Sequence, residues 1–220
     1  MSYINKIHEL GTKYDSDKIT HHNYHGIYDF FLKSFYNDKG SLLEIGIDSG
    51  KSLQMWMELF PHAFVYGMDI NVSAKSDRFN IIQGDQSNSI DLYKVKSNVG
   101  ELFLINDDGS HIPEHQLLTF NILFPCLREG GIYILEDIET SYWTKGGLYG
   151  YQTRYGYKHP NSIVEIFKEV ADSINSEFAG THVNKVEHCD KIDSITFSKN
   201  CIIVVKKTQV RRDYRFSEFL

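Results

Sequence analysis

The sequence predicts an α/β protein: a Rossmann-like, doubly wound, mostly parallel sheet of seven strands that ends in an antiparallel hairpin. Short apolar runs alternate with segments of helical spacing, which indicates a parallel sheet covered by helices on both faces. Two acidic clusters directly follow two of the apolar runs, so they fall where strands end. The last two apolar runs are separated only by a Lys-Asn turn, which is typical of a hairpin.

The first half of the chain contains three expected strands and three expected helices. Residues 23–36 have the apolar spacing of a helix and precede the first buried-strand run, 41–46. A helix over 51–60 follows and ends at Pro61, because proline cannot continue it. The next elements are strands at 64–70 and 79–82 and a short helix at 89–96.

The second half continues the alternation and then departs from it. A strand at 101–106 leads into a helix over 113–127, which opens with proline, where the missing N–H costs little. Gly130 and Gly131 are expected to turn the chain into a fifth strand, 132–137. A helix over 161–174 and the hairpin strands 193–198 and 201–207 complete the pattern.

The length and composition indicate one soluble domain. We expect residues 1–220 to form a single unit: an N-terminal helical lid (1–38), a Rossmann-like core (39–208) and a tail (209–220). The net charge of −6 argues against nucleic acid or an anionic membrane as the main partner. Three scattered cysteines, no apolar leader and no apolar stretch of spanning length favour a cytoplasmic protein.

Two acidic clusters indicate the chemistry. LINDDGSH (104–111) and ILED (134–137) each carry carboxylates to the end of a strand, and ligands of open parallel sheets bind at the carboxyl ends of strands. Carboxylates that converge there repel one another unless a cation or a hydrogen-bonding ligand joins them. His111, three residues after Asp108, adds a group that can exchange a proton near neutral pH. We therefore expect a metal-assisted and base-assisted active site.

The loop LEIGIDSGKS (43–52) indicates a cofactor site without phosphates. Only three residues separate Gly46 from Gly50, whereas a P-loop has four between its glycines. Asp48 occupies the place of the second glycine in a dinucleotide fingerprint. A nucleoside remains, with Asp69 accepting hydrogen bonds from its ribose and Asp85 from its adenine amino group. The alternative is that the acids at the strand ends only cap neighbouring helices.

The ordered set over five strands resembles class I S-adenosylmethionine (SAM) methyltransferases. More narrowly, GDQSN, the stretch from DDGSH to EDIETSYW (107–143) and the leader LGTKYDSDKITHHNYHGIY (10–28) resemble the metal-dependent O-methyltransferases of deoxysugars in macrolide tailoring. The family resemblance implies that SAM and Mg²⁺, or another divalent cation, are the cofactors. It implies a sugar or glycoside acceptor, such as a rhamnose-like deoxyhexose, and it leaves the oligomeric state open, a homo-oligomer included.

The same resemblance implies roles for individual residues. Asp108, Glu136 and Asp137 would hold the metal, and His111, together with Asp108, would be catalytic, His111 as the general base. Tyr142 and Trp143 would border the acceptor, and the tyrosine-rich run 146–157 suits an acceptor loop. Cofactor contacts are expected at Glu44, Gly46, Ile47, Ser52, Asp69, Ile70, Asp85, Gln86 and Asp107. The chain is compact beside relatives that carry a large additional N-terminal domain.

Two other functions and one other role for His111 stay open on the sequence. The acidic cluster would also serve a metal-dependent methyltransferase of catechol-like phenols. A cofactor-binding protein without catalysis is a third reading, although Asp108, His111, Glu136 and Asp137 together speak against it. Taken alone, His111 could be a structural residue at a helix N-terminus. His115 is expected to be structural, and His21, His22 and His25 to belong to the lid rather than to a zinc site.

Overall fold

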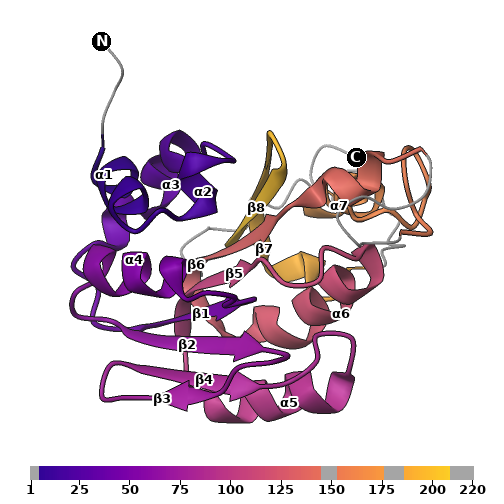
Figure 1. Ribbon diagram of the computed structural model, residues 1–220. Helices are drawn as coiled ribbons and strands as arrows, with labels where there is room; N and C mark the ends of the chain where they lie inside the picture. Colours follow the sequence, from indigo (N-terminus) through magenta and orange to yellow (C-terminus); the bar gives the residue numbers. More distant parts are fainter. Residues whose placement is uncertain (1–4, 145–152, 176–185, 209–220) are drawn as a thin grey trace, which may run out of the picture.

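The computed structural model describes residues 5–144, 153–175 and 186–208, and within them it contains one eight-stranded sheet (Figure 1). The strand order is β3-β4-β2-β1-β5-β6-β8-β7. The bounds are β1 Ser41–Ile45, β2 Phe64–Asp69, β3 Ala74–Lys75, β4 Phe79–Gln83, β5 Leu102–Asp107, β6 Leu127–Glu136, β7 Ile192–Ser198 and β8 Cys201–Lys206. The predicted fold class and hairpin are confirmed. The strand number was one too low, because β3 has only two residues and shows no periodicity.

Seven α-helices are found in the described ranges: α1 Lys6–Lys13, α2 Asp17–Thr20, α3 His25–Leu32, α4 Lys51–Leu59, α5 Ser89–Asn98, α6 Pro113–Leu123 and α7 Ile163–Ile174. Four short 3₁₀ segments accompany them: η1 Lys33–Phe35, η2 Phe124–Cys126, η3 Ile138–Tyr142 and η4 Cys189–Lys191. The helices expected over 23–36 and 113–127 therefore each end in a tighter turn, η1 and η2. Helices α1 and α2 were not predicted.

The prediction that Gly130 and Gly131 precede the strand was wrong. Gly130 and Gly131 lie inside β6, which begins at Leu127. Leu102 of β5 pairs with Leu127 of β6, but Leu104, two residues later, pairs with Ile132, five residues later. The additional residues of β6 between these pairs form an irregularity in the parallel ladder. Gly130 has φ +70°, a left-handed conformation that glycine adopts without steric cost.

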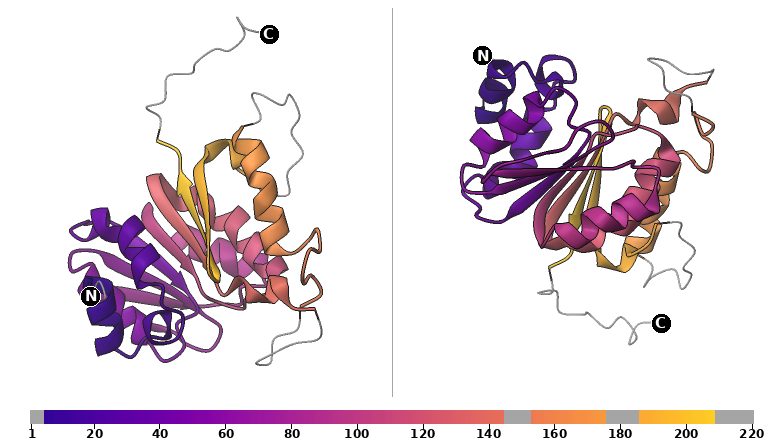
Figure 2. Two further views of the ribbon diagram at one scale, coloured as in Figure 1. Left: turned by 90° about the horizontal axis from the view of Figure 1, so that it is seen from above. Right: turned by 60° about the horizontal axis from the view of Figure 1, so that its bottom comes forward.

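Helices cover both faces of the sheet, as the alternation of elements predicts (Figures 1 and 2). Residues of α1 to α4 form one buried cluster with alternate residues of the central strands, such as Leu42 of β1 and Ile134 of β6. Residues of α5, α6 and α7 form a second cluster with the residues of opposite orientation, such as Leu43 and Tyr133. The side on which a strand residue lies therefore follows from its parity.

The chain reverses its direction of winding between β1 and β5. From β1 it proceeds to β2 and β4 on one side and then returns to add β5 and β6 on the other. Asp108 N–H donates to the Ile45 carbonyl (2.9 Å), which joins the loops that leave these two strands. Such a switch point is where open α/β sheets bind ligands. No helix in the described part of the chain is both long and apolar enough to cross a bilayer.

Candidate active site

A cavity of about 550 Å³ opens at the carboxyl ends of the central strands. Its wall includes the loops that follow β1, β2, β4 and β5, and Asp15 and Asp17 of the N-terminal segment. Of the expected cofactor residues, the wall contains Gly46, Ile47, Ser52, Asp69, Ile70, Asp85 and Gln86. Glu44 and Asp107 are completely buried and do not belong to the wall.

Gly46 brings the loop after β1 against the loop after β5. It has φ +83°, and a Cβ at this position would lie 2.1 Å from the Asp108 carbonyl oxygen. No side chain fits that space, because both atoms belong to backbone. Gly50, at φ +78°, is the N-cap residue of α4, so the loop presents the N-terminus of a nine-residue helix to the cavity.

Asp69 organises the glycine loop as well as facing the cavity. One carboxylate oxygen accepts from the N–H groups of Ile47 (3.0 Å) and Asp48 (3.2 Å), and the other from Asn71 (2.7 Å) and Val72 (3.1 Å). Burial alone would raise the pKa of Asp69, but the four backbone N–H groups lower it below its usual value. The residue is therefore held ionised at the end of β2, where it was expected.

Gln86 and Asp107 form a support beneath the loop after β5. Gln86 donates to Asp107 Oδ1 (2.6 Å) and accepts from the Ser110 N–H (2.7 Å), and Tyr133 donates to Asp107 Oδ2 (3.1 Å). Burial raises the pKa of Asp107 to about 7, against the effect of these hydrogen bonds. Asp85 remains at the cavity wall and accepts from the Ser87 N–H (2.8 Å).

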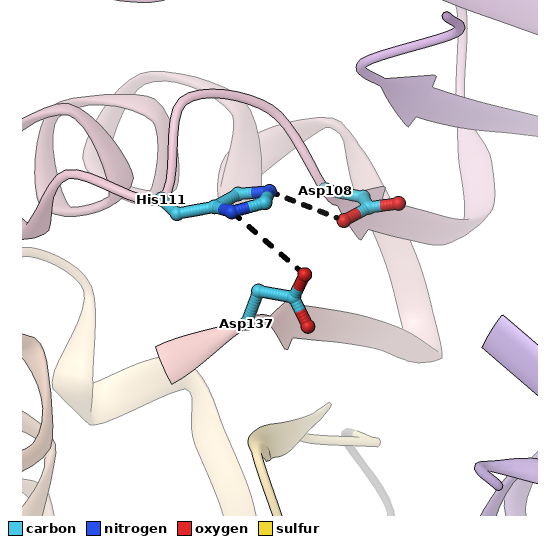
Figure 3. A group of neighbouring side chains, drawn as sticks. All are labelled: Asp108, His111 and Asp137. Atoms are coloured by element: carbon cyan, nitrogen blue, oxygen red, sulfur yellow. Dashed lines mark ion pairs between the residues drawn. The ribbon is translucent and has the colours of Figure 1, made fainter. Parts of the chain in front are cut away.

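Asp108, His111 and Asp137 all line the cavity, and their side chains point toward one another (Figure 3). His111 Nε2 lies 3.4 Å from Asp108 Oδ1, and His111 Nδ1 lies 3.7 Å from Asp137 Oδ2. His111 and Asp137 both have left-handed backbones, with φ of +56° and +51°. Non-glycine residues in this region cost free energy and concentrate at functional sites. The local fold therefore directs both side chains to the same point at a cost in stability.

The charges of Asp108, His111 and Asp137 shift one another's pKa values. Burial would lower the pKa of His111, but the hydrogen bond and charge of Asp108, followed by Asp137 and Glu139, raise it to about 9. Burial would raise the pKa of Asp108, but the Lys18 ammonium and the His111 ring lower it to about 2. Burial, and then the neighbouring Asp108, raise the pKa of Asp137.

The donor set fits a hard divalent cation. One ligand atom from each of Asp108, His111 and Asp137 lies within 4.8 Å of the others, so the two carboxylates are close enough to share one Mg²⁺, with the His111 ring beside them. Carboxylate oxygens are the preferred ligands of Mg²⁺, and the adjoining cavity leaves room for further oxygen ligands. Glu136, the third expected ligand, is not in this group. Its carboxylate contacts Lys18 and Tyr28, and burial and the nearby Asp108 raise its pKa to about 8.

The N-terminal segment contributes side chains that the spacing of residues does not reveal. Lys18 of α2 is buried, with Nζ against an Asp108 oxygen, 3.0 Å from Glu136 Oε2 and 3.3 Å from Glu44 Oε1. Tyr28 donates to Glu136, and burial raises its pKa well above the usual value. These residues belong to the segment expected to be a lid.

Asp137, which directly follows β6, is held by three side chains from other parts of the chain. Tyr24 (3.0 Å) and Asn200 (2.8 Å) donate to its Oδ1, and His22 Nδ1 lies 3.5 Å from the same oxygen. His22, expected in the lid, thus reaches the acidic cluster, whereas His25 packs on His8. His115 bonds Ser110 Oγ (2.9 Å), in line with a structural role. Tyr142 is half exposed, and the acceptor loop expected at 146–157 lies outside the described residues up to residue 152.

Comparison with solved structures identifies the fold, although no family model matches the chain. A solved structure of the MycE methyltransferase from the mycinamycin biosynthetic pathway, in complex with Mg, SAH and mycinamycin VI, superposes with a TM-score of 0.80 and 27% identity. The match covers 97% of this chain and 58% of that chain. The fold is therefore that of the class I SAM-dependent methyltransferases.

The relatives with similar sequences are sugar O-methyltransferases, a narrower group within this class. The chain is 30% identical over 210 residues to 8-demethyl-8-alpha-L-rhamnosyl tetracenomycin-C 2'-O-methyltransferase of Streptomyces olivaceus, covering 90% of this chain and 54% of the relative. It is 36% identical over 145 residues to mycinamicin VI 2''-O-methyltransferase of Micromonospora griseorubida, covering 61% of this chain and 36% of the relative. The chain spans about half or less of the length of these relatives. Its homologues are thus sugar O-methyltransferases of the macrolide and tetracenomycin pathways.

Proposed function

We propose that this protein is a SAM-dependent, Mg²⁺-dependent O-methyltransferase that acts on a hydroxyl of a sugar, such as a rhamnose-like deoxyhexose of a glycosylated product. One observation carries the proposal: Asp108, His111 and Asp137 face the same cavity as the glycine loop and Asp69. A methyl donor at the loop and an acceptor oxygen at the acidic group would then share one cavity. The names of the relatives, which include a rhamnosyl substrate, support a sugar acceptor.

The cofactor end would bind a nucleoside without phosphates. Gly46 lets the loop approach closely, Asp69 offers a fixed negative charge at the cavity wall, and Ile70 is exposed there with 57% of its surface accessible. We propose that these residues, with Asp85 and Gln86, contact SAM. Glu44 and Asp107 would act from behind the wall, through Ser52 and Gln86 respectively.

The acidic end would orient and deprotonate the acceptor. When bound, a divalent ion would supply positive charge beside the acceptor oxygen, with Asp108 and Asp137 as its protein ligands; Glu136 as a further ligand stays a prediction. His111 lies between these carboxylates and would take the acceptor proton. The negative charges of Asp108 and Asp137 raise the pKa of His111 and so keep its ring protonated. A cation held by these two carboxylates would lower that pKa and free His111 to accept a proton. In-line placement of oxygen, methyl and sulfur would supply much of the remaining rate enhancement.

We further propose that residues 39–208 form the catalytic core and that the N-terminal segment completes its active site. Asp15 and Asp17 at the cavity wall and Lys18 among the carboxylates support a catalytic rather than a covering role. The three free cysteines support a cytoplasmic location.

Transfer of a labelled methyl group from SAM to a panel of rhamnosides, other glycosides and catechols tests the proposal. We expect transfer to glycosides that stops in EDTA and returns with Mg²⁺, and none with Asp137→Asn. An Asp77→Asn variant, changed at an exposed residue between β3 and β4 that does not line the cavity, serves as the matched control and should keep full activity. Preferred methylation of catechols would reassign the acceptor, and metal-independent transfer would refute the proposed metal site.

A further inference from the structure

We propose that Lys18 is a positioning residue of the metal site: its ammonium stays among Glu44, Asp108 and Glu136 and fixes the Asp108 carboxylate for the divalent ion. The inference rests on the proposed function, because it assumes that Asp108 and Asp137 bind the ion. It assigns a working role to a residue in the segment that precedes the sheet.

The first argument is the parity of the strands. Glu44 of β1 lies opposite Asn106 of β5 in the parallel ladder, and Asn106 lies opposite Ile134 of β6, two residues before Glu136. Because β1, β5 and β6 are neighbours, their polar residues form a row on one face, the face that α1 to α4 cover. A cation on that face can reach acids at the ends of three strands at once.

The second argument is how firmly Lys18 is held there. Only 1% of its surface is accessible, and the Ile19 side chain beside it packs against Gly11 of α1, where even a Cβ would lie 2.0 Å from Ile19 Cγ1. The Lys18 carbonyl also accepts from the Tyr24 N–H (2.9 Å). A buried ammonium is stable only with close counter-ions, and Lys18 has three. The lysine is thus part of the packed structure rather than a mobile surface group.

The third argument is how the oxygens of Asp108 are divided. Its Oδ2 accepts from Lys18, whereas its Oδ1 faces His111 at 3.4 Å. Lys18 therefore fixes the rotation of the carboxylate and leaves one oxygen for the ion. Outer partners of metal ligands act in this way, and their loss typically costs about 10- to 100-fold in metal affinity. The ion pairs of Lys18 are with Glu44, Asp108 and Glu136, so the Asp137 carboxylate would remain to attract the divalent ion.

Calorimetric titration of Mg²⁺ into the wild type and into variants with changed lysines tests the role. Lys18→Met should weaken Mg²⁺ binding by about 10- to 100-fold. Lys18→Arg, which keeps a charged donor, should recover part of the affinity. Lys13→Met is the matched control, because Lys13 lies in the neighbouring helix and its ion pair with Glu58 is exposed. The Mg²⁺ concentration that half-activates turnover should rise with the dissociation constant, while turnover at saturating Mg²⁺ falls much less.

A second variant guards against loss of folding. Lys18→Met leaves buried carboxylates without their cation. The double variant Lys18→Met/Glu44→Gln removes one of these charges and should therefore melt at a higher temperature than Lys18→Met. Because Asp108 has lost its donor in both variants, both should bind Mg²⁺ equally weakly. Unchanged or tighter Mg²⁺ binding in either folded variant would overturn the role of Lys18, and so would failure of every Lys18 variant to fold. Wild-type affinity in Asp137→Asn, or no binding by the wild type, would overturn the proposed metal site itself.

Discussion

Replacement of Gly46 by alanine should destabilise the protein and disrupt the cofactor loop together. A Cβ at residue 46 would meet the Asp108 carbonyl oxygen at 2.1 Å, and the atom it meets is backbone, which cannot rotate away. The left-handed φ of +83° adds about 1–2 kcal/mol for a residue with a Cβ. Overpacking of this kind adds typically about 1–3 kcal/mol. We therefore expect Gly46→Ala to lower the free energy of unfolding by about 2–5 kcal/mol.

Urea unfolding followed by circular dichroism measures that loss, and calorimetry with S-adenosylhomocysteine measures the effect on the loop. A loss of this size lowers the melting temperature of a chain of this length by roughly 5–20 °C. Gly100→Ala is the matched control, because no atom lies within 4 Å of the added Cβ and its φ is ordinary. It should leave stability within about 1 kcal/mol of the wild type. If Gly46→Ala unfolds at the same urea concentration as Gly100→Ala, the close approach of the two loops is not as described.

Three further outcomes follow from the site. Asp69→Ala should weaken binding of S-adenosylhomocysteine at least tenfold from a starting Kd of about 1 μM. Asp69→Asn should weaken it less, because the amide oxygen can still accept from two of the four backbone N–H groups. Equal affinity in the wild type and both variants would contradict the assignment of Asp69 to the cofactor. ATP and NAD should not bind measurably in the same titrations. His111→Ala should lower turnover by about two to four orders of magnitude with nearly unchanged cofactor affinity, whereas a purely structural histidine would lower only the melting temperature.

The order of helices and strands was predictable from sequence because buried elements have characteristic patterns of apolar residues. The continuous apolar runs of β1, β5 and β6 show that both of their faces are covered, and helical spacing between them requires parallel crossovers. The β3 strand and the short helix α2 were missed because two and four residues carry no measurable period. The register irregularity in β6 was missed because a glycine pair reads equally well as a turn before a strand or a bulge within one.

The cavity end of the site was predictable for a related reason. In a parallel sheet every strand end lies on one edge, so acids that follow apolar runs must converge without any knowledge of tertiary contacts. In the structure Asp108, His111 and Asp137 line one cavity with the glycine loop and Asp69. The sequence pattern does not tell which acid faces the cavity and which faces inward. Asp107 and Asp108 are adjacent, yet they point to opposite faces, one to Gln86 and Tyr133 and the other to Lys18 and His111.

Parity resolves part of that ambiguity and shows where sequence reasoning ends. Leu104, Asn106 and Asp108 share one orientation, as do Leu42 and Glu44, so three acids or amides at even positions must face the same layer of helices. Buried carboxylates on that layer require a counter-ion from the helices that cover it. The segment 10–28 offers Lys13 and Lys18, and no local pattern distinguishes them. Only packing does so: Ile19 inserts against Gly11, which directs Lys18 inward, while Lys13 remains at the surface with Glu58. The ion pairs of Lys18 in the candidate active site are therefore set by a contact between two short N-terminal helices. Substitutions at Gly11 should weaken the proposed Mg²⁺ binding without changing a ligand.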